Sequence, residues 1–268
     1  MGTLTRTDRE FWRGVLGAGG SRVIPRWTCD PVPGTAEQAA SVPDDLLDEV
    51  RRFAREQGVP PRCVLLAAHA KVLAALSGQR EVLTGYVAVD GGQPLPCRLT
   101  TEPDSWRAVL RDASRADAEL LSHGDCRLDD IRRELGVTEP PFETVFDPFG
   151  AGGDLAEDLA EDTVLRVGIS HNGGGAELRL RYRTDVLDAA CAARIAGYHL
   201  TALTLMTADP DAEHRRQSLL SARELHFQLD GLAGPRRTLP DGRLHELFER
   251  RVREHPDAVA AVHGAVQW

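Results

Sequence analysis

The sequence has no apolar run of the ~20 residues that a membrane-spanning helix needs, and its N-terminus lacks the apolar core of a signal peptide. It has no excess of positive charge either, because 41 acidic residues outweigh 32 Lys and Arg residues and give a net charge of −9. The arginines are interleaved with acids, which disfavours non-specific binding of nucleic acid. These absences predict a cytoplasmic chain with no membrane or nucleic-acid partner.

Signatures of metal and cofactor sites are also missing. The five cysteines are scattered, form no C-x-x-C pair and are odd in number, which favours free thiols. The glycines after His171 lack the Lys-Ser/Thr of a phosphate-binding loop, and the acids of residues 154–162 lack EF-hand spacing. No H-E-x-x-H motif is present. We therefore expect no metal and no cofactor.

The chain does contain a succession of amphipathic segments. Their apolar periodicity predicts helices over residues 41–58, 60–78, 104–124, 127–136 and 187–207. Strands are predicted over 81–89 and 141–149, and a hairpin over 163–184. Thr7 and Glu10 form an expected capping box, and residues 17–40 are expected to be loop or irregular strand. The order predicts an α+β fold, with helices outside a sheet.

The stretch "SHGDCRLDD" brings His123, Asp125 and Cys126 within four positions. A nucleophilic cysteine needs a base within hydrogen-bond reach and a lowered pKa, and sequence proximity provides neither. A turn between two helices, with Asp125 as a helix cap, explains the same residues. We favour this structural interpretation, and His123 and Asp125 remain weak catalytic candidates.

The C-terminal stretch "LHELFERRVREHPDAVAAV" (244–262) resembles the opening helix and strand of an adenylation domain in nonribosomal peptide synthetases. Upstream, "FWRGVLGAG", "VLLAAHAKVLAALSGQREVLTGYVAV" and "ISHNGGGAELRLRYRTDVLDAA" resemble the C-terminal lobe of the condensation domain in the same enzymes. The resemblance implies one lobe of the chloramphenicol-acetyltransferase type, with a mixed sheet covered by helices. It divides the chain into a condensation-like domain (1–228), a linker (229–243) and the start of an adenylation domain (244–268).

The resemblance also places "SHGDCRLDD" on the family's His-Gln-Asp-x-Pro-Phe-Glu segment, in which His123 and Asp125 match and which is chiefly structural. The catalytic His-His-x-x-x-Asp-Gly motif of the other lobe is absent, since no two histidines are adjacent. The family's Gly-Phe-Phe-Val-Asn-Thr segment is missing after "YVAV". The expectation is a truncated lobe without catalytic residues.

The expected function is that of a non-catalytic platform for an adenylation domain in the same polypeptide, within antibiotic or other secondary-metabolite biosynthesis. Two alternatives stay open. The chain is half of a condensation or acyltransfer enzyme, completed by a lobe in trans or by dimerisation; or it is a docking module for a carrier protein or another synthetase subunit. The expected partner contacts lie on the last helix, at Leu244, Leu247, Phe248 and Val252.

Overall fold

The structure is a computed structural model that describes residues 4–17, 23–150, 159–172, 175–234 and 242–268. The chain divides into two units, Met1–Ser221 and Ala222–Trp268. Residues 154–158 of the acid-rich stretch 154–162 and the hairpin turn at 173–174 lie outside the described residues. The expectations about a cation site and a glycine loop fall largely on these positions.

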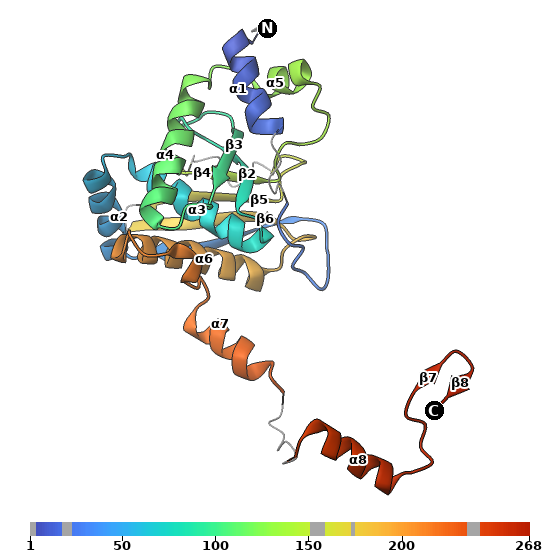
Figure 1. Cartoon of the computed structure of the whole chain (residues 1–268). Helices are drawn as coiled ribbons and strands as arrows, with labels where there is room; N and C mark the ends of the chain where they lie inside the picture. The colour runs from blue at the N-terminus through green and yellow to red at the C-terminus, as the bar shows by residue number, and fades with distance from the viewer. Residues whose placement is uncertain (1–3, 18–22, 151–158, 173–174, 235–241) are drawn as a thin grey trace. The chain divides into compact units, whose positions relative to one another are not determined.

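A mixed six-stranded sheet forms the centre of the first unit, with strand order β1-β6-β5-β4-β2-β3 (Figure 1). The strands are β1 (Thr35–Val42), β2 (Glu81–Tyr86), β3 (Leu95–Thr100), β4 (Thr144–Asp147), β5 (Leu165–Asn172) and β6 (Gly175–Arg183). The β2–β4 and β4–β5 pairs are parallel, and the other three pairs are antiparallel. The expected hairpin is confirmed, since β5 and β6 pair from Leu165↔Tyr182 to Asn172↔Gly175.

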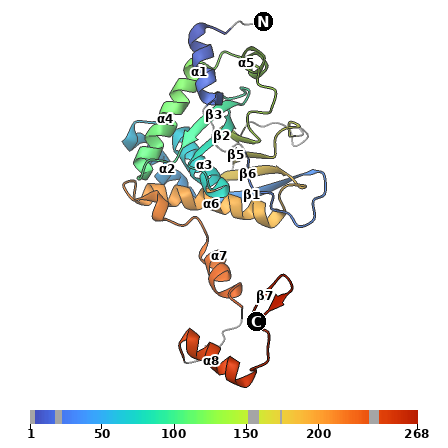
Figure 2. The same cartoon turned by 45° about the vertical axis from the view of Figure 1, so that its right-hand side comes forward.

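Helices pack on one face of this sheet because one face of its strands is apolar. On β6, Leu178, Leu180 and Tyr182 are buried, and the arginines between them are not. The helices are α2 (Asp44–Gln57), α3 (Pro61–Ser77), α4 (Trp106–Ser122) and α6 (Ala189–Ala208). Figure 2 shows them beside the strands, and α3 contacts both α4 and α6. The α+β fold with a helix-covered mixed sheet is therefore confirmed.

Local signals set most helix ends where the sequence predicted them. Gly58 and Gly78 adopt left-handed conformations that end α2 and α3. The side chains of Ser105 and Asp188 cap α4 and α6. α5 (Leu128–Leu135) follows α4, but Asp125 caps neither helix, because the residue before α5 is Arg127.

A helix is present at the expected N-terminal capping box, but it begins earlier than the predicted cap at Thr7. α1 spans Arg6–Gly17, and its capping box is formed by Thr5 and Asp8 in place of Thr7 and Glu10. The backbone N–H of Asp8 donates to Thr5 Oγ1, and the N–H of Thr5 donates to Asp8 Oδ2, both at 3.1 Å. Glu10 instead pairs with Arg6 on the helix surface.

Two strands of the first unit differ from the prediction. β1 is a regular strand, and most of it lies in the stretch expected to be loop or irregular strand. β3 follows the turn at Gly91, and no strand was expected there. Both strands are fixed by partners far away in the sequence: β1 pairs with β6, and β3 pairs with β2. Small residues in β1 and Pro96 in β3 weaken the local strand signal.

The second unit contains α7 (Ala222–His226), a π-helical turn (Phe227–Gly231), α8 (Leu244–Glu254) and the short strands β7 (Val262–His263) and β8 (Val266–Gln267). No described residue of these elements is buried. Within the described residues, no single helix is long and apolar enough to span a membrane. The pair α2 and α3 reaches that length and composition only together, across a 107° bend.

Candidate functional site

His123 lies at the C-terminal end of α4 and contacts the N-terminal helix α1. Its Nδ1 is 2.7 Å from Asp8 Oδ1, and its ring stacks on Phe11 with centroids 4.3 Å apart. The hydrogen bond from Thr5 and then the one with His123 lower the pKa of Asp8. A carboxylate and an aromatic ring of α1 therefore hold this imidazole from two sides.

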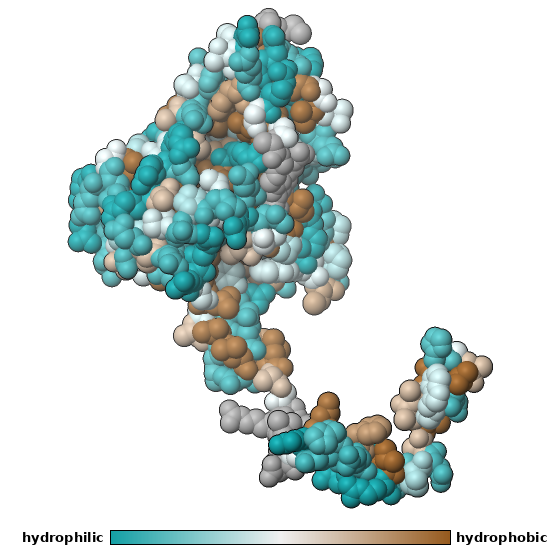
Figure 3. All heavy atoms as spheres, in the orientation of Figure 1, coloured by the Kyte–Doolittle hydropathy of each residue, from teal (hydrophilic) through white to brown (hydrophobic). Residues whose placement is uncertain are grey.

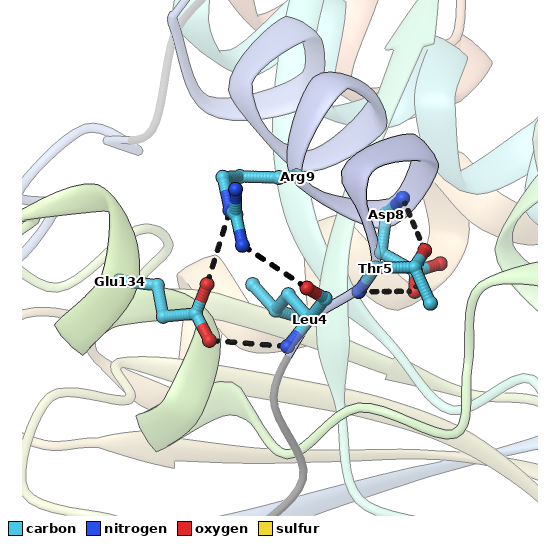
Figure 4. Close-up of polar contacts among 5 residues, drawn as sticks. All are labelled: Leu4, Thr5, Asp8, Arg9 and Glu134. Carbon is cyan, nitrogen blue, oxygen red and sulfur yellow. Dashed lines mark hydrogen bonds and ion pairs between the residues drawn. The ribbon is translucent and has the colours of Figure 1, made fainter.

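A second contact fixes α1 against α5 (Figure 4). The carboxylate of Glu134 accepts hydrogen bonds from the backbone N–H of Leu4 at 3.0 Å and from Arg9 Nε at 3.2 Å. Arg9 also donates to the carbonyl oxygen of Leu4. Trp12, which is fully buried, anchors the same helix in the core.

The other residues of the His-Gly-Asp-Cys stretch do not join His123 in a catalytic arrangement. Asp125 is exposed, and among the described residues it has no hydrogen-bond or ion-pair partner. Cys126 is half-buried, and burial and then the Asp8 carboxylate raise the pKa of its thiol. A raised pKa lowers the thiolate fraction that a nucleophile requires. The geometry favours a structural role for this stretch.

A buried carboxylate that was not expected connects α3, α4 and β2. Asp117 accepts two hydrogen bonds from Arg62, both at 2.9 Å, and one from the Tyr86 hydroxyl at 2.8 Å. The Cys63 thiol lies 3.6 Å from the same carboxylate. Burial and then the Asp117 charge raise the pKa of Cys63 to about 12, and the same two causes raise the pKa of Tyr86. The sequence signal that could have identified this buried carboxylate is the position of Asp117 on the apolar face of α4.

Two buried histidines form a second polar chain in the core. Nδ1 of His199 donates to the carbonyl oxygen of Ile195 at 2.8 Å, so its Nε2 is free to accept from His69 Nδ1 at 3.1 Å. Nε2 of His69 then lies 3.4 Å from Thr84 Oγ1. Burial lowers the pKa of both histidines, that of His199 to about 4. This series of hydrogen bonds is consistent with both imidazoles being neutral.

Exposed apolar side chains gather in the second unit (Figure 3). Leu244 is 84% exposed and Phe248 is 61% exposed, on one face of α8 with Val252 and the half-buried Leu247. The other exposed large apolar residues of this unit are Leu225, Phe227, Leu229, Leu232, Val259, Val262, Val266 and Trp268. An exposed apolar surface of this kind is typical of a segment that packs against a partner.

The described part of the chain has no group of three or more His, Cys, Asp or Glu side chains that could hold a metal ion. The buried and half-buried histidines His69, His123, His199 and His214 are instead hydrogen-bonded within the fold. His214, for example, lies 2.6 Å from the carbonyl oxygen of Pro103 through Nε2.

Comparisons with known proteins define the class. No family model matches the sequence. A four-domain nonribosomal peptide synthetase, in a structure with AMP and glycine, matches 95% of this chain with a TM-score of 0.73 and 13% identity, over 23% of its own length. The first condensation domain of the calcium-dependent antibiotic synthetase matches 80% of the chain with a TM-score of 0.60 and 21% identity, over 54% of its length. The fold is that of the C-terminal lobe of a condensation domain.

The sequence relatives agree with this fold. Tyrocidine synthase 3 of Brevibacillus parabrevis is 25% identical over 259 residues, which cover 83% of this chain and 4% of the synthase. The AMB antimetabolite synthetase AmbE of Pseudomonas aeruginosa is 29% identical over 218 residues, which cover 67% of this chain and 10% of the synthetase. The chain is similar in sequence and fold to the condensation domains of nonribosomal peptide synthetases, and it spans a small part of the length of these relatives.

Proposed function

We propose that this chain is a non-catalytic condensation-like lobe that serves as a platform for an adenylation domain, to which residues 244–268 contribute the first helix and strand. The observation that carries the proposal is the second unit. Its helices and strands bury no described side chain, and α8 presents Leu244, Phe248 and Val252 to solvent. Removal of such an apolar face from water contributes about 25 cal/mol of favourable free energy per Å², so contact with a partner surface would stabilise it.

The contacts of the histidines support the non-catalytic part of the proposal. A general base must reach the proton that it removes. His69 and His199 are fully enclosed and bonded to each other, and His123 is held between Asp8 and Phe11. In this account, the lobe contributes surface and rigidity, and ATP-dependent activation of an amino or aryl acid belongs to the adenylation domain.

The test is a binding measurement between an adenylation domain that lacks its first helix and strand and the 268-residue chain. We expect the chain to bind, and Leu244→Asp together with Phe248→Asp to lower the affinity at least about tenfold, because charge enters the apolar contact. The control matched in charge is Arg250→Gln together with Arg253→Gln, two exposed residues on the opposite side of the same helix. Equal binding by both double variants contradicts the proposal. Retention of a carrier protein alone would favour the docking module instead.

A further inference from the structure

Strand β1 forms one edge of the sheet and is paired on one side only. It pairs with β6 in an unbroken register, from Thr35↔Arg183 to Val42↔Ala176. Within the described ranges, no backbone hydrogen bond reaches its outer side. Natural edge strands are usually short, bulged, charged or interrupted by proline, which prevents pairing with another chain. β1 has eight residues, no proline, no bulge and Glu37 as its one charged residue.

The opposite edge of the sheet has the protection that β1 lacks. β3 contains Pro96, which has no N–H to offer a further strand. It also packs against α1 and α4. The two edges of one sheet therefore differ, and β1 is the edge that is open to strand addition.

The backbone geometry shows which groups of β1 point outward. The carbonyl oxygen of Gly34 accepts from the N–H of Thr184 at 3.0 Å, so Gly34 faces β6. Because an antiparallel ladder alternates with a period of two, the even-numbered residues of β1 face β6 as well. The residues that direct their N–H and C=O groups away from the sheet are Thr35, Glu37, Ala39 and Ser41.

The chain is acidic overall, but the charges near β1 allow a second copy of the same chain to approach this edge. Glu37 is compensated by Arg179, whose Nη1 lies 3.6 Å from Glu37 Oε1. α6 packs against β1 and has one charged residue, Arg194, whose guanidinium lies 5.6 Å from the ring of Trp27. Neither β1 nor the helix that packs against it therefore carries a run of like charges that would repel a second copy.

We propose that β1 pairs antiparallel with β1 of a second copy, about a two-fold axis at Gln38. This register pairs Thr35 with Ser41 and Glu37 with Ala39 across the axis, so all outward residues have partners. An axis at Glu37 would place two carboxylates directly opposite each other, which is destabilising. An axis at Ala39 would place Thr35 opposite Pro43, which has no N–H.

Gln38 is the residue that the proposed axis passes through. In the single chain its Nε2 donates to the carbonyl oxygen of Ala39 at 2.9 Å and covers one outward acceptor. In the pair, the two Gln38 side chains lie opposite each other, and the acceptor becomes available to Glu37 of the second copy. The interface is isologous, and the two sheets become continuous.

The proposal is tested by sedimentation equilibrium of the 268-residue chain from about 1 to about 100 µM, a range that detects weak association. We expect a reversible monomer–dimer equilibrium. Gln38→Lys and Gln38→Glu should each raise the dissociation constant at least about threefold, because like charges meet at the axis. An equimolar mixture of the two variants should restore the dimer. Ala39→Lys is the matched control, and it should retain dimerisation, because the new lysine lies opposite Glu37.

Three results overturn the proposal. The first is that the chain stays monomeric throughout the concentration range. That result would also be found if β1 pairs with an extended peptide of another protein and not with a second copy. Another is a dimer that neither Gln38 variant weakens. The third is weakening by both variants without rescue in the mixture. Far-UV circular dichroism of each variant, and the rescue itself, separate loss of pairing from loss of folding.

Discussion

Asp8 and His123 lie 115 positions apart in the sequence, and 2.7 Å separates Oδ1 of the first from Nδ1 of the second. Asp8 lies in the first turn of α1, and His123 is the residue at the end of α4. Phe11 stacks on the same imidazole one turn further along α1. The pair therefore fastens the N-terminal helix to the helical layer of the lobe.

His123→Ala should lower the free energy of unfolding by about 1–2 kcal/mol, because it removes one charged hydrogen bond and one aromatic contact. Urea unfolding followed by tryptophan fluorescence measures the change, since Trp12 is buried on α1. Asp125→Ala is the control, and this exposed residue should change stability by less than about 0.5 kcal/mol. An equal loss from both substitutions would contradict the structural assignment of His123.

Native alkylation with iodoacetamide tests whether Cys126 is a reactive nucleophile. Cys29 is exposed, Cys126 is half-buried with a raised pKa, and burial protects Cys63, Cys97 and Cys191. Mass spectrometry at neutral pH should find Cys29 modified first and Cys126 more slowly, because Cys29 is more accessible and the raised pKa of Cys126 lowers the thiolate fraction of that residue. Faster labelling of Cys126 than of Cys29 would indicate an activated thiol and would support the catalytic interpretation.

Stability should fall as the pH drops below about 6.5, the pKa of histidine in an unfolded chain. Burial lowers the pKa of His199 to about 4 in the folded chain, so the unfolded chain binds more protons between these two values. The stability from neutral His199 is present above about pH 6.5 and should decrease by about 2 kcal/mol between pH 7 and pH 5. Urea unfolding at the two pH values measures the loss.

His199→Gln keeps an acceptor and a donor near His69 and Ile195 but removes the titration. It should reduce the pH dependence, whereas His245→Gln on the exposed surface of α8 should leave it unchanged. An unchanged slope in the His199 variant would show that the pH dependence arises elsewhere, for example at His214, whose pKa burial also lowers.

The Asp117 carboxylate should be more important for stability than any exposed ion pair of the lobe. Asp117→Ala leaves the Arg62 guanidinium and the Tyr86 hydroxyl without their shared partner, and it should cost about 3–5 kcal/mol. Tyr86→Phe removes one neutral donor and should cost about 1 kcal/mol. Thermal unfolding of both variants gives the order. A larger loss from Tyr86→Phe than from Asp117→Ala would contradict this assignment.

Periodicity in the sequence was sufficient to predict helices and strands where buried apolar and exposed polar residues alternate strongly. The alternation of Leu178, Leu180 and Tyr182 with arginines predicted the hairpin, and the apolar faces predicted α2, α3, α4 and α6. β1 was not predicted as a regular strand, because Ala36, Ala39 and Ala40 are too small to produce such a pattern. Its register is fixed by β6, about 140 residues away along the chain, and not by local preference.

The contacts around His123 and Asp117 could not be predicted from the sequence. The sequence singled out His123, but its partner Asp8 lies 115 positions away along the chain, and only the fold brings the two together. The Asp117 network was missed for the same reason, since Arg62 is 55 positions away. On α8 the structure shows Leu244, Phe248 and Val252 to be exposed and Leu247 to be half-buried, and their contact with a partner stays a prediction.

The most direct test of the platform account is substrate-dependent ATP–pyrophosphate exchange by the synthetase module that carries this segment. Exchange and soluble yield are compared for the module with and without residues 1–221, the first unit of the structure. The account predicts that removal of this unit lowers exchange, yield or both, because the adenylation domain loses the surface on which it packs. Unchanged exchange and unchanged yield would contradict the platform function.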